Sequence, residues 1–254
     1  NGSRRNVFKG GLDFKKAVAK FKPDCIHSHL LSGIIYSKLC AYSKPLVYTH
    51  HNAIVDTNPA LFRAIINRCD DFIGISKICA ENLNKYITGN RKCSTIYNAI
   101  DSNRLRIKNT SSPLVKDDIK LLAIGCISKQ KNYIQMLEAV LKLKETFAGK
   151  FTLRIAGEGD KGITNALLDF VNKNDLSDYV VFLGNRRDIP ELLEQADIFV
   201  MSSLWEGLPI ALLEAQCLGV PSIVTDVGGC KEVIDITNGG LVVSVNDVKD
   251  LAES

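Results

Sequence analysis

The residues best suited to chemistry in this chain lie in segment 198–229. An apolar, β-rich run leads through two serines to Glu206, and Pro209 then opens a helical stretch that contains Glu214. Proline suits the first turn of a helix, where its missing N–H is not needed. We expect the helix 207–218 to be buried, because it is apolar on nearly every side. A carboxylate within such a helix requires a partner.

The two carboxylates are expected to converge at the start of this helix. Helical side chains lean toward the N-terminus, so Glu214 leans toward the end at which Glu206 lies. Backbone N–H groups and the positive end of the helix dipole favour an anion there, and carboxylates accept hydrogen bonds from hydroxyls. The turn therefore predicts a ligand that carries both phosphates and sugar hydroxyls.

Two further turns rich in glycine follow predicted strands. Gly125 opens a helix entrance with Lys129 and Lys131, where N–H groups and a lysine could hold phosphate; loop lysines of no special role are an equal alternative. The segment 157–162 matches GxGxxG, with Asp178 at a distance suited to a ribose contact. Because it follows the second strand of its half, we interpret it as a tight turn, with a dinucleotide site as the alternative.

The four histidines form two pairs, His27 with His29 and His50 with His51, each at the C-terminal end of a predicted strand. Ligands of open α/β sheets bind at that edge. A zinc site needs three or four ligands, and no Cys or Asp accompanies these residues at ligand spacing, so we predict no metal site. A polar contact with substrate and hydrogen-bonded structural histidines remain open. No Asp-x-Asp pair occurs in the sequence.

The composition is that of an ordinary globular protein. The chain has 254 residues, of which 46% are hydrophobic and 24% charged, enough for one large or two modest domains. A net charge of +4 argues against a dedicated nucleic-acid binder. The eight cysteines are scattered without a CxxC pair, which predicts reduced core residues of a cytoplasmic protein.

The first 22 residues are strongly basic and contain one acidic residue, Asp13. Residues 12–21 predict an amphipathic basic helix. A surface helix packed on a sheet is the interpretation we favour, and docking on an anionic membrane at its inner face is the alternative.

Strand-like runs alternate with helical runs through most of the chain, which predicts α/β architecture with parallel sheets covered by helices. In the first half we expect strands at 24–27, 46–49, 72–75 and 94–97, and helices near 30–42, 59–69 and 76–86. In the second half we expect strands at 119–124, 151–156, 180–183, 198–201, 222–225 and 241–243, and helices at 132–147, 160–174, 189–196 and 207–218, with a further helix starting at 248.

Residues 102–118 are polar and interrupted by Pro113, which predicts a linker between two Rossmann-like domains. We place these domains at 1–110 and 119–254. The first half is short for a doubly wound domain, and the sequence stops at the start of a helix. We therefore expect a fragment with a truncated first domain and an incomplete C-terminus.

Together these segments resemble the retaining glycosyltransferases of the GT-B fold, family 4. The most specific element is Glu206-x7-Glu214, followed by Gly219-x-Pro221 and DVGG at 226–229. Supporting elements are PDCIHSH at 23–29, VYTHHN at 47–52, IYNAID at 96–101, GCISKQKN at 125–132 and FLGN at 182–185.

The resemblance implies a role for each candidate residue. Glu214 would bind the ribose of a nucleotide sugar, and Glu206 would contact the transferred sugar. The backbone at Gly207 and Leu208 would contact the phosphate or the sugar, and Lys131, in the loop from Gly125, would neutralise the diphosphate. Asn185 and Arg186 would lie near the base. His51 would face the donor from the first domain.

The implied activity is retaining, metal-independent transfer of a hexose-type sugar, without a cofactor, from a nucleotide diphosphate sugar to a glycan or lipid-linked acceptor. Cell-surface polysaccharide synthesis is the expected setting. The sequence departs from the family pattern at two positions. Cys126 occupies a position where the family commonly has Arg, so Arg186 or Lys129 would have to replace that cation. Ala99 stands where Gly is usual. The alternatives are a non-catalytic homologue that binds a nucleotide sugar or a partner enzyme, an inactive fragment, and an NAD-dependent oxidoreductase supported by GxGxxG alone.

Overall fold

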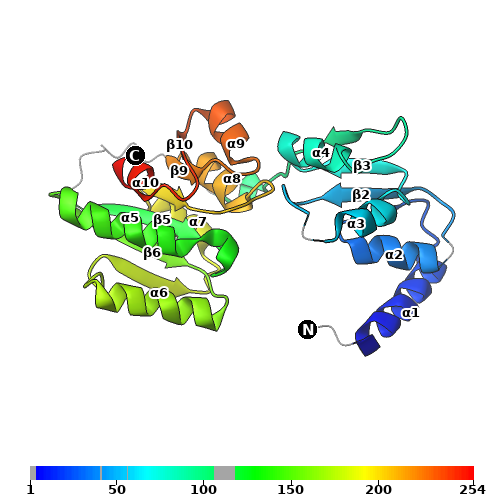
Figure 1. The fold of residues 1–254 in the computed structure, drawn as a ribbon, viewed down its shortest axis with the longest axis horizontal. Helices are drawn as coiled ribbons and strands as arrows, with labels where there is room; N and C mark the ends of the chain where they lie inside the picture. Colours follow the sequence, from blue (N-terminus) through cyan, green and yellow to red (C-terminus); the bar gives the residue numbers. More distant parts are fainter. Residues whose placement is uncertain (1–3, 41, 56, 106–117) are drawn as a thin grey trace. The chain divides into compact units, whose positions relative to one another are not determined.

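The computed structural model describes residues 4–40, 42–55, 57–105 and 118–254. The chain divides into two compact units, Asn1–Tyr97 and Asn98–Ser254, each with a parallel sheet and covering helices (Figure 1). The sequence placed the end of the first domain at 110, whereas the structure groups residues from Asn98 onward with the second unit. The expected linker begins in a short 3-10 helix, Ser102–Arg104, and its remainder at 106–117 lies outside the described residues.

The first unit contains a four-stranded parallel sheet of order β1-β2-β3-β4. Its elements are α1 (Arg4–Phe21), β1 (Ile26–Ser28), α2 (Leu31–Leu39), β2 (Leu46–His50), α3 (Pro59–Ile66), β3 (Asp71–Gly74), α4 (Lys77–Asn84) and β4 (Cys93–Thr95). The strand order runs in one direction, so right-handed crossovers place α2, α3 and α4 on one face. Side chains from all three helices share a core with Leu46, Tyr48 and Phe72 of the sheet.

Local sequence signals set where these helices begin. The Asn58 side chain accepts hydrogen bonds from the N–H groups of Ala60 and Leu61, and Pro59 occupies the first turn of α3. At α4 the Ser76 hydroxyl caps the N–H of Cys79. Each cap directly follows a strand or its loop, so the helices start at the carboxyl edge of the sheet.

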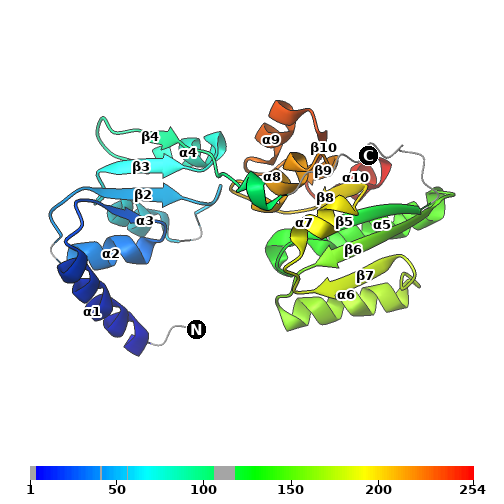
Figure 2. The same cartoon turned by 180° about the vertical axis from the view of Figure 1, so that it is seen from behind.

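The second unit contains a six-stranded parallel sheet of order β10-β9-β8-β5-β6-β7. Its elements are β5 (Asp118–Ile124), α5 (Tyr133–Thr146), β6 (Lys150–Ala156), α6 (Lys161–Lys173), β7 (Val180–Gly184), α7 (Ile189–Glu194), β8 (Ile198–Met201), α8 (Ile210–Cys217), β9 (Ser222–Thr225), α9 (Cys230–Thr237), β10 (Gly240–Val243) and α10 (Val248–Glu253). Figures 1 and 2 show α5, α6 and α10 on one face and α7 and α8 on the other. The strand order reverses direction after β7, which moves the later crossover helices to the second face.

The α/β fold class and every expected strand are confirmed, although several boundaries shift by a few residues. The helix expected at 207–218 runs from Ile210 to Cys217, with Pro209 as its N-cap. Its expected burial is wrong in part: Leu212 and Ala215 are buried, but Ile210 is 42% exposed. Helix α9 was not predicted at all.

The expectation that the cysteines are core residues holds for Cys69, Cys79 and Cys230, whereas Cys25 and Cys126 are exposed. All eight are free thiols. Among the described residues, no helix combines the length and apolar character needed to cross a bilayer.

Candidate active site

The strand order of the second unit defines where a ligand should bind. The chain leaves β5 toward β6 and β7 and then returns to β8 on the other side of β5. Open α/β sheets bind ligands outside the carboxyl ends of the strands at such a reversal. The loops after β5 (residues 125–132) and after β8 (residues 202–209) meet at this point, and both contain predicted site residues.

These two loops are joined by hydrogen bonds. The N–H of Leu204 donates to the carbonyl of Gln130 at 2.8 Å, and the Gln130 side chain donates to the carbonyl of Trp205 at 2.9 Å. The Ser202 hydroxyl lies 3.1 Å from the carbonyls of Lys131 and Asn132. The backbone that precedes Glu206 is therefore fixed relative to the backbone that carries Lys131.

A third loop, residues 226–229 after β9, packs against the backbone of Glu206 and Gly207. The N–H of Gly229 donates to the carbonyl of Gly207 at 2.7 Å. Gly228 has φ +52, and a Cβ there would overlap the carbonyl of Glu206. Both constraints require glycine, since an L side chain rarely adopts this conformation and no space exists for one. The DVGG segment thus supports the backbone of the Glu206 turn.

The central feature of the turn is a nearly buried ion pair between Lys131 and Glu206. Their Nζ and Oε1 atoms are 2.7 Å apart, and the side chains are 16% and 8% exposed. The Ser203 hydroxyl donates to the same carboxylate oxygen at 2.7 Å. A Cβ at Gly125 would lie 2.7 Å from Cε of Lys131, so glycine at this position leaves the space that the lysine side chain needs. The sequence predicted both charged residues but not their pairing, and it missed Ser203.

Backbone donors lie beside this pair. Gly207 and Leu208 are buried, and no hydrogen bond within the described part of the chain engages their N–H groups. Buried backbone N–H groups almost always have a partner. Two such groups next to a lysine are suited to bind an oxygen-rich anion.

Glu214 lies at a cavity beside the start of α8. It contributes to a cavity of about 660 Å³ with Ile210, Asp101 and Arg187, and Glu206 is not among the lining residues. The two carboxylates thus do not line one cavity, and their convergence on a single ligand stays a prediction. Glu206 lies in the loop and turns inward to Lys131, whereas Glu214 lies one turn into α8 beside the half-exposed Ile210.

A second cavity, of about 370 Å³, lies over the carboxyl ends of β5, β6 and β7. It is lined by Gly125, Cys126, Glu158, Asn185 and Arg186, among others. Asn185 and Arg186 are exposed. The Arg186 guanidinium binds both oxygens of Asp188 in a fork, and this hydrogen bonding holds the pKa of the Asp188 carboxyl below its usual range.

The GxGxxG segment has a packing explanation. A Cβ at Gly157 would overlap the carbonyl of Gly125, and one at Gly159 would overlap the carbonyl of Ile127. Ile127 and Gly159 also form an isolated parallel bridge. The first two glycines therefore let the loops after β5 and β6 approach each other, as the tight-turn interpretation expected.

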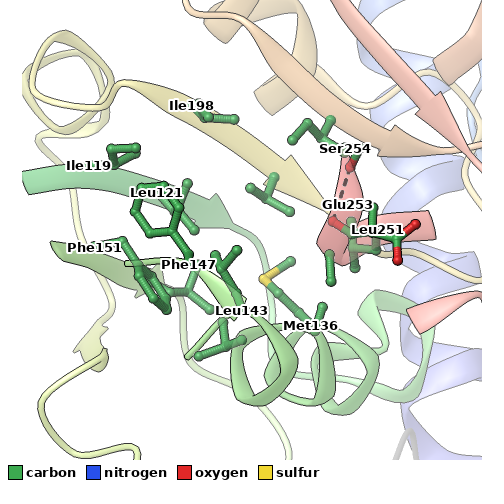
Figure 3. Close-up of a pocket in the computed structure, with 16 residues that line it drawn as sticks. Ile119, Leu121, Met136, Leu143, Phe147, Phe151, Ile198, Leu251, Glu253 and Ser254 are labelled. Carbon is green, nitrogen blue, oxygen red and sulfur yellow. Dashed lines mark hydrogen bonds between the residues drawn. The ribbon is translucent and has the colours of Figure 1, made fainter. Parts of the chain in front are cut away.

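An apolar cavity of about 320 Å³ lies at the other end of the same sheet (Figure 3). Its lining includes Ile119 and Ile198, which stand near the starts of β5 and β8, together with Phe147, Phe151 and Leu251. The polar residues in its lining are Glu253 and Ser254, and the rest of the lining is apolar, whereas ligand sites usually combine several converging polar groups. We do not assign the chemistry to it.

The histidines of the first unit separate onto two faces because side chains alternate along a strand. The His50 side chain points to the same face of the sheet as Tyr48, toward the helices. It is 5% exposed, and its ring lies against Phe62 with ring centroids 5.7 Å apart. Burial lowers the pKa of His50 to about 4, and its Nε2 has no hydrogen-bond partner among the described residues. His50 is a structural residue of the core.

His51 points to the opposite face, where it is exposed. Its Nε2 lies 2.7 Å from Nδ1 of His29, and the His29 and His27 rings are 4.3 Å apart. His27 in turn contacts the Thr49 hydroxyl at 2.6 Å. Within the described residues, no group of three His, Cys, Asp or Glu side chains has the geometry to hold a metal ion.

Both halves of the chain match glycosyltransferase family models. Residues 106–254 match the family model described as glycosyl transferases group 1, and residues 1–104 match the model described as glycosyltransferase family 4. The chain belongs to the glycosyl transferases group 1 family.

Two bacterial relatives illustrate the similarity. Over 261 aligned residues the chain is 26% identical to the UDP-Gal:alpha-D-GlcNAc-diphosphoundecaprenol alpha-1,3-galactosyltransferase of Escherichia coli, covering 94% of this chain and 67% of that protein. It is 30% identical over 212 residues to the N,N'-diacetylbacillosaminyl-diphospho-undecaprenol alpha-1,3-N-acetylgalactosaminyltransferase of Campylobacter jejuni, covering 84% of this chain and 52% of that protein. The chain thus spans about half to two thirds of the length of these relatives.

Solved structures agree on the fold. The Anabaena protein HepE in complex with UDP-glucose matches with a TM-score of 0.81 at 20% identity, over 96% of this chain and 70% of that one. The sucrose-phosphate synthase of Thermosynechococcus elongatus matches with a TM-score of 0.82 at 19% identity, over 98% of this chain and 67% of that one. The chain has the GT-B fold of two Rossmann-like domains.

Proposed function

We propose that this protein is a retaining, metal-independent glycosyltransferase of the hexosyltransferase type. It moves a sugar from a nucleotide diphosphate sugar to a glycan or lipid-linked acceptor in cell-surface polysaccharide synthesis. The observation that carries the proposal is the Lys131–Glu206 pair beside the N–H groups of Gly207 and Leu208, at the point where the strand order reverses. The Escherichia coli and Campylobacter jejuni relatives are both named as enzymes that transfer a sugar to diphosphoundecaprenol-linked acceptors, which supports the substrate class.

Each group in this turn has a chemical task in the proposal. As the bond between the sugar and the diphosphate breaks, negative charge grows on the leaving phosphate. Lys131 and the two N–H groups stabilise that charge, and because they are already in place they need little rearrangement. Glu206 accepts hydrogen bonds from the transferred sugar, Glu214 from the ribose, and the loop at Asn185 and Arg186 contacts the base.

Retention follows in the proposal from attack on the same face as the departing diphosphate, with His51 as a further catalytic residue that contacts the donor sugar. The sequence offers no Ser–His–Asp arrangement as an alternative nucleophile. The test is the anomeric configuration of the product, read by proton NMR immediately after transfer. A product with inverted configuration contradicts the proposal.

Metal independence is proposed because lysine and backbone donors can balance the diphosphate, and because no Asp-x-Asp pair is present in the sequence. Transfer is expected to continue at an unchanged rate in EDTA. If chelation abolishes transfer and an added divalent cation restores it, the charge balance proposed here is wrong.

A non-catalytic homologue that binds a nucleotide sugar or a partner enzyme is the second candidate. It is favoured by Cys126, which replaces a cation of the family pattern, and by the Arg186 guanidinium, which already binds Asp188. Binding of UDP or GDP without turnover of any sugar derivative supports this candidate over the enzyme. Turnover that is lost in Glu206→Gln supports the enzyme.

We further propose that the protein works in the cytoplasm, at the inner face of the membrane, through α1. Lys9, Lys16 and Lys20 repeat at intervals of seven and four residues, so they share one stripe of the helix with Leu12, which is 62% exposed. A basic stripe with an apolar residue suits an anionic lipid surface. Sedimentation with phosphatidylglycerol vesicles, but not with phosphatidylcholine vesicles, is expected and should disappear in the Lys9→Ala, Lys16→Ala, Lys20→Ala triple variant. Equal sedimentation of the variant contradicts this role.

A further inference from the structure

The His51 ring is held by one described side chain, and that side chain has its own support. Nδ1 of His29 lies 2.7 Å from Nε2 of His51, and among the described residues no other group hydrogen-bonds this ring. The His29 ring lies against the His27 ring at 4.3 Å between centroids, and His27 is anchored on the Thr49 hydroxyl. The contacts thus run from the Thr49 hydroxyl through the His27 and His29 rings to His51.

Strand geometry brings these residues together. In the parallel pairing of β1 with β2, His27 lies opposite Val47. Side chains two residues apart share a face, so His27 and His29 point to the same side as Thr49 and His51. His29 and His51 are each the first residue after their strand. Two adjacent parallel strands therefore deliver two histidines to one point at the carboxyl edge.

The distance limits which protonation states can exist. Two imidazoles joined at 2.7 Å share a single proton between the facing nitrogens, because two facing N–H groups would repel. Burial, with His29 and His27 nearby, lowers the pKa of His51, and burial followed by His29 lowers the pKa of His27. The neutral forms of His51 and His27 are thus favoured, and the hydrogen bond decides on which nitrogen His51 carries its proton.

We propose that His29 is a positioning residue, which donates from Nδ1 to Nε2 of His51 and holds His51 as the tautomer protonated on Nδ1. His51 then presents a fixed N–H donor on its other side. Such a donor matches sugar hydroxyl and phosphate oxygens, the acceptors of the donor substrate. Only this last step rests on the proposed function, since the tautomer itself is a property of the first unit.

The tautomer is measured directly by long-range proton–nitrogen NMR of the whole chain labelled with ¹⁵N-histidine. The chain has four histidines, so single substitutions assign every signal. We expect Nδ1 of His51 to be protonated and Nε2 to be unprotonated. His29→Ala should lose this pattern, and His29→Asn should keep it, because the asparagine amide can donate from about the position of Nδ1. His27→Ala is the matched control: it removes a ring of the same cluster but not the hydrogen bond, and the pattern should persist.

Turnover supplies the second measurement. With a nucleotide sugar that the wild-type chain uses, His29→Ala is expected to lower kcat about 10- to 100-fold, because the reacting groups lose their alignment. KM for the nucleotide sugar should stay within about twofold, and His29→Asn should recover most of kcat.

Three results overturn the proposal: a wild-type His51 protonated on Nε2, an unchanged His51 pattern in His29→Ala, or an altered pattern in that variant with wild-type kcat. Absence of turnover by the wild-type chain would instead contradict the proposed function. The NMR comparison then still decides whether His29 sets the tautomer.

Discussion

The carboxyl edges of the two sheets are constructed differently. In the second unit, three loops tied by backbone hydrogen bonds enclose a nearly buried pair, Lys131 and Glu206. In the first unit, His27, His29 and His51 are exposed and are held by side-chain hydrogen bonds and ring contacts alone. Groups that stabilise developing charge must be in place before the reaction, whereas an imidazole can be tuned by its tautomer. We infer that the second edge holds an enclosed charged pair, whereas the first presents an exposed imidazole whose tautomer its neighbour sets.

The largest effect is expected from Glu206→Ala. This change leaves Lys131 nearly buried without its counter-charge and removes the proposed sugar contact. Transfer should fall about 10²- to 10³-fold, and the free energy of unfolding should fall by about 3 kcal/mol. Activity assays and urea unfolding measure the two effects.

Glu253→Ala is the matched control for this change. The Glu253 carboxylate lies 3.8 Å from Lys142 and 3.9 Å from Lys249 at the surface, so its removal should cost less than about 1 kcal/mol. If both variants lose the same free energy of unfolding, burial does not make the Lys131–Glu206 pair more important for stability than a surface ion pair.

Gly228→Ala tests the loop that supports this edge. Its positive φ and the overlap of a Cβ with the Glu206 carbonyl should together lower the free energy of unfolding by about 3 kcal/mol. Gly219→Ala offers a close control, because Gly219 has φ +71 but a Cβ added there would meet no atom within 4 Å. Strain alone should cost that variant about 1 kcal/mol. Equal losses in chemical denaturation would show that the close backbone approach is unimportant.

The first edge is expected to respond to pH through the buried His50. Burial lowers the pKa of His50 to about 4, against about 6.5 for the unfolded chain. Between these values the unfolded state binds a proton that the folded state does not. The contribution of His50 to the free energy of unfolding therefore decreases as pH falls, by about 1.4 kcal/mol per pH unit.

Urea unfolding of the wild-type chain and of His50→Gln, at pH 5 and pH 7, isolates this contribution. The variant should lose less stability on acidification than the wild type. The same loss in both chains would mean that His50 accepts a proton in the folded state.

The smallest effect is expected from Arg186→Ala. Because the Arg186 guanidinium is exposed and already binds Asp188, UDP affinity measured by calorimetry should fall less than about threefold. Asp188→Ala, which removes only the partner, is the companion variant and should leave affinity unchanged or slightly higher. A tenfold loss in Arg186→Ala would instead identify this residue as the cation missing at position 126.

Much of the fold could be predicted because strand period and turn chemistry are local. Helix α9 was missed although Cys230, Val233 and Ile234 show helical spacing of three and four residues and are all buried. The β-branched residues of this short segment, between two strands, obscured the pattern. The different environments of His50 and His51 could have been predicted, since neighbours along a strand point to opposite faces.

The candidate site was predictable by residue type but not by contact. Lys131 and Glu206 are 75 positions apart, and their contact depends on β8 pairing with β5. The sequence shows alternating strands and helices but does not fix the order of the strands. Likewise, the sequence placed Glu214 near the turn, and the start of α8 at Ile210 puts it one turn into the helix, at a cavity whose lining does not include Glu206.

The central claim is that Lys131 and its neighbours receive the diphosphate of a nucleotide sugar. Calorimetric titration of UDP and GDP into the wild-type chain and into Lys131→Gln tests it most directly. We predict that the wild type binds at least one of the two and that the folded variant binds that nucleotide about 10- to 100-fold more weakly, the loss expected when one charged hydrogen-bonding group is removed. Equal affinity in the two chains, or no binding of either nucleotide by the wild type, would contradict the account.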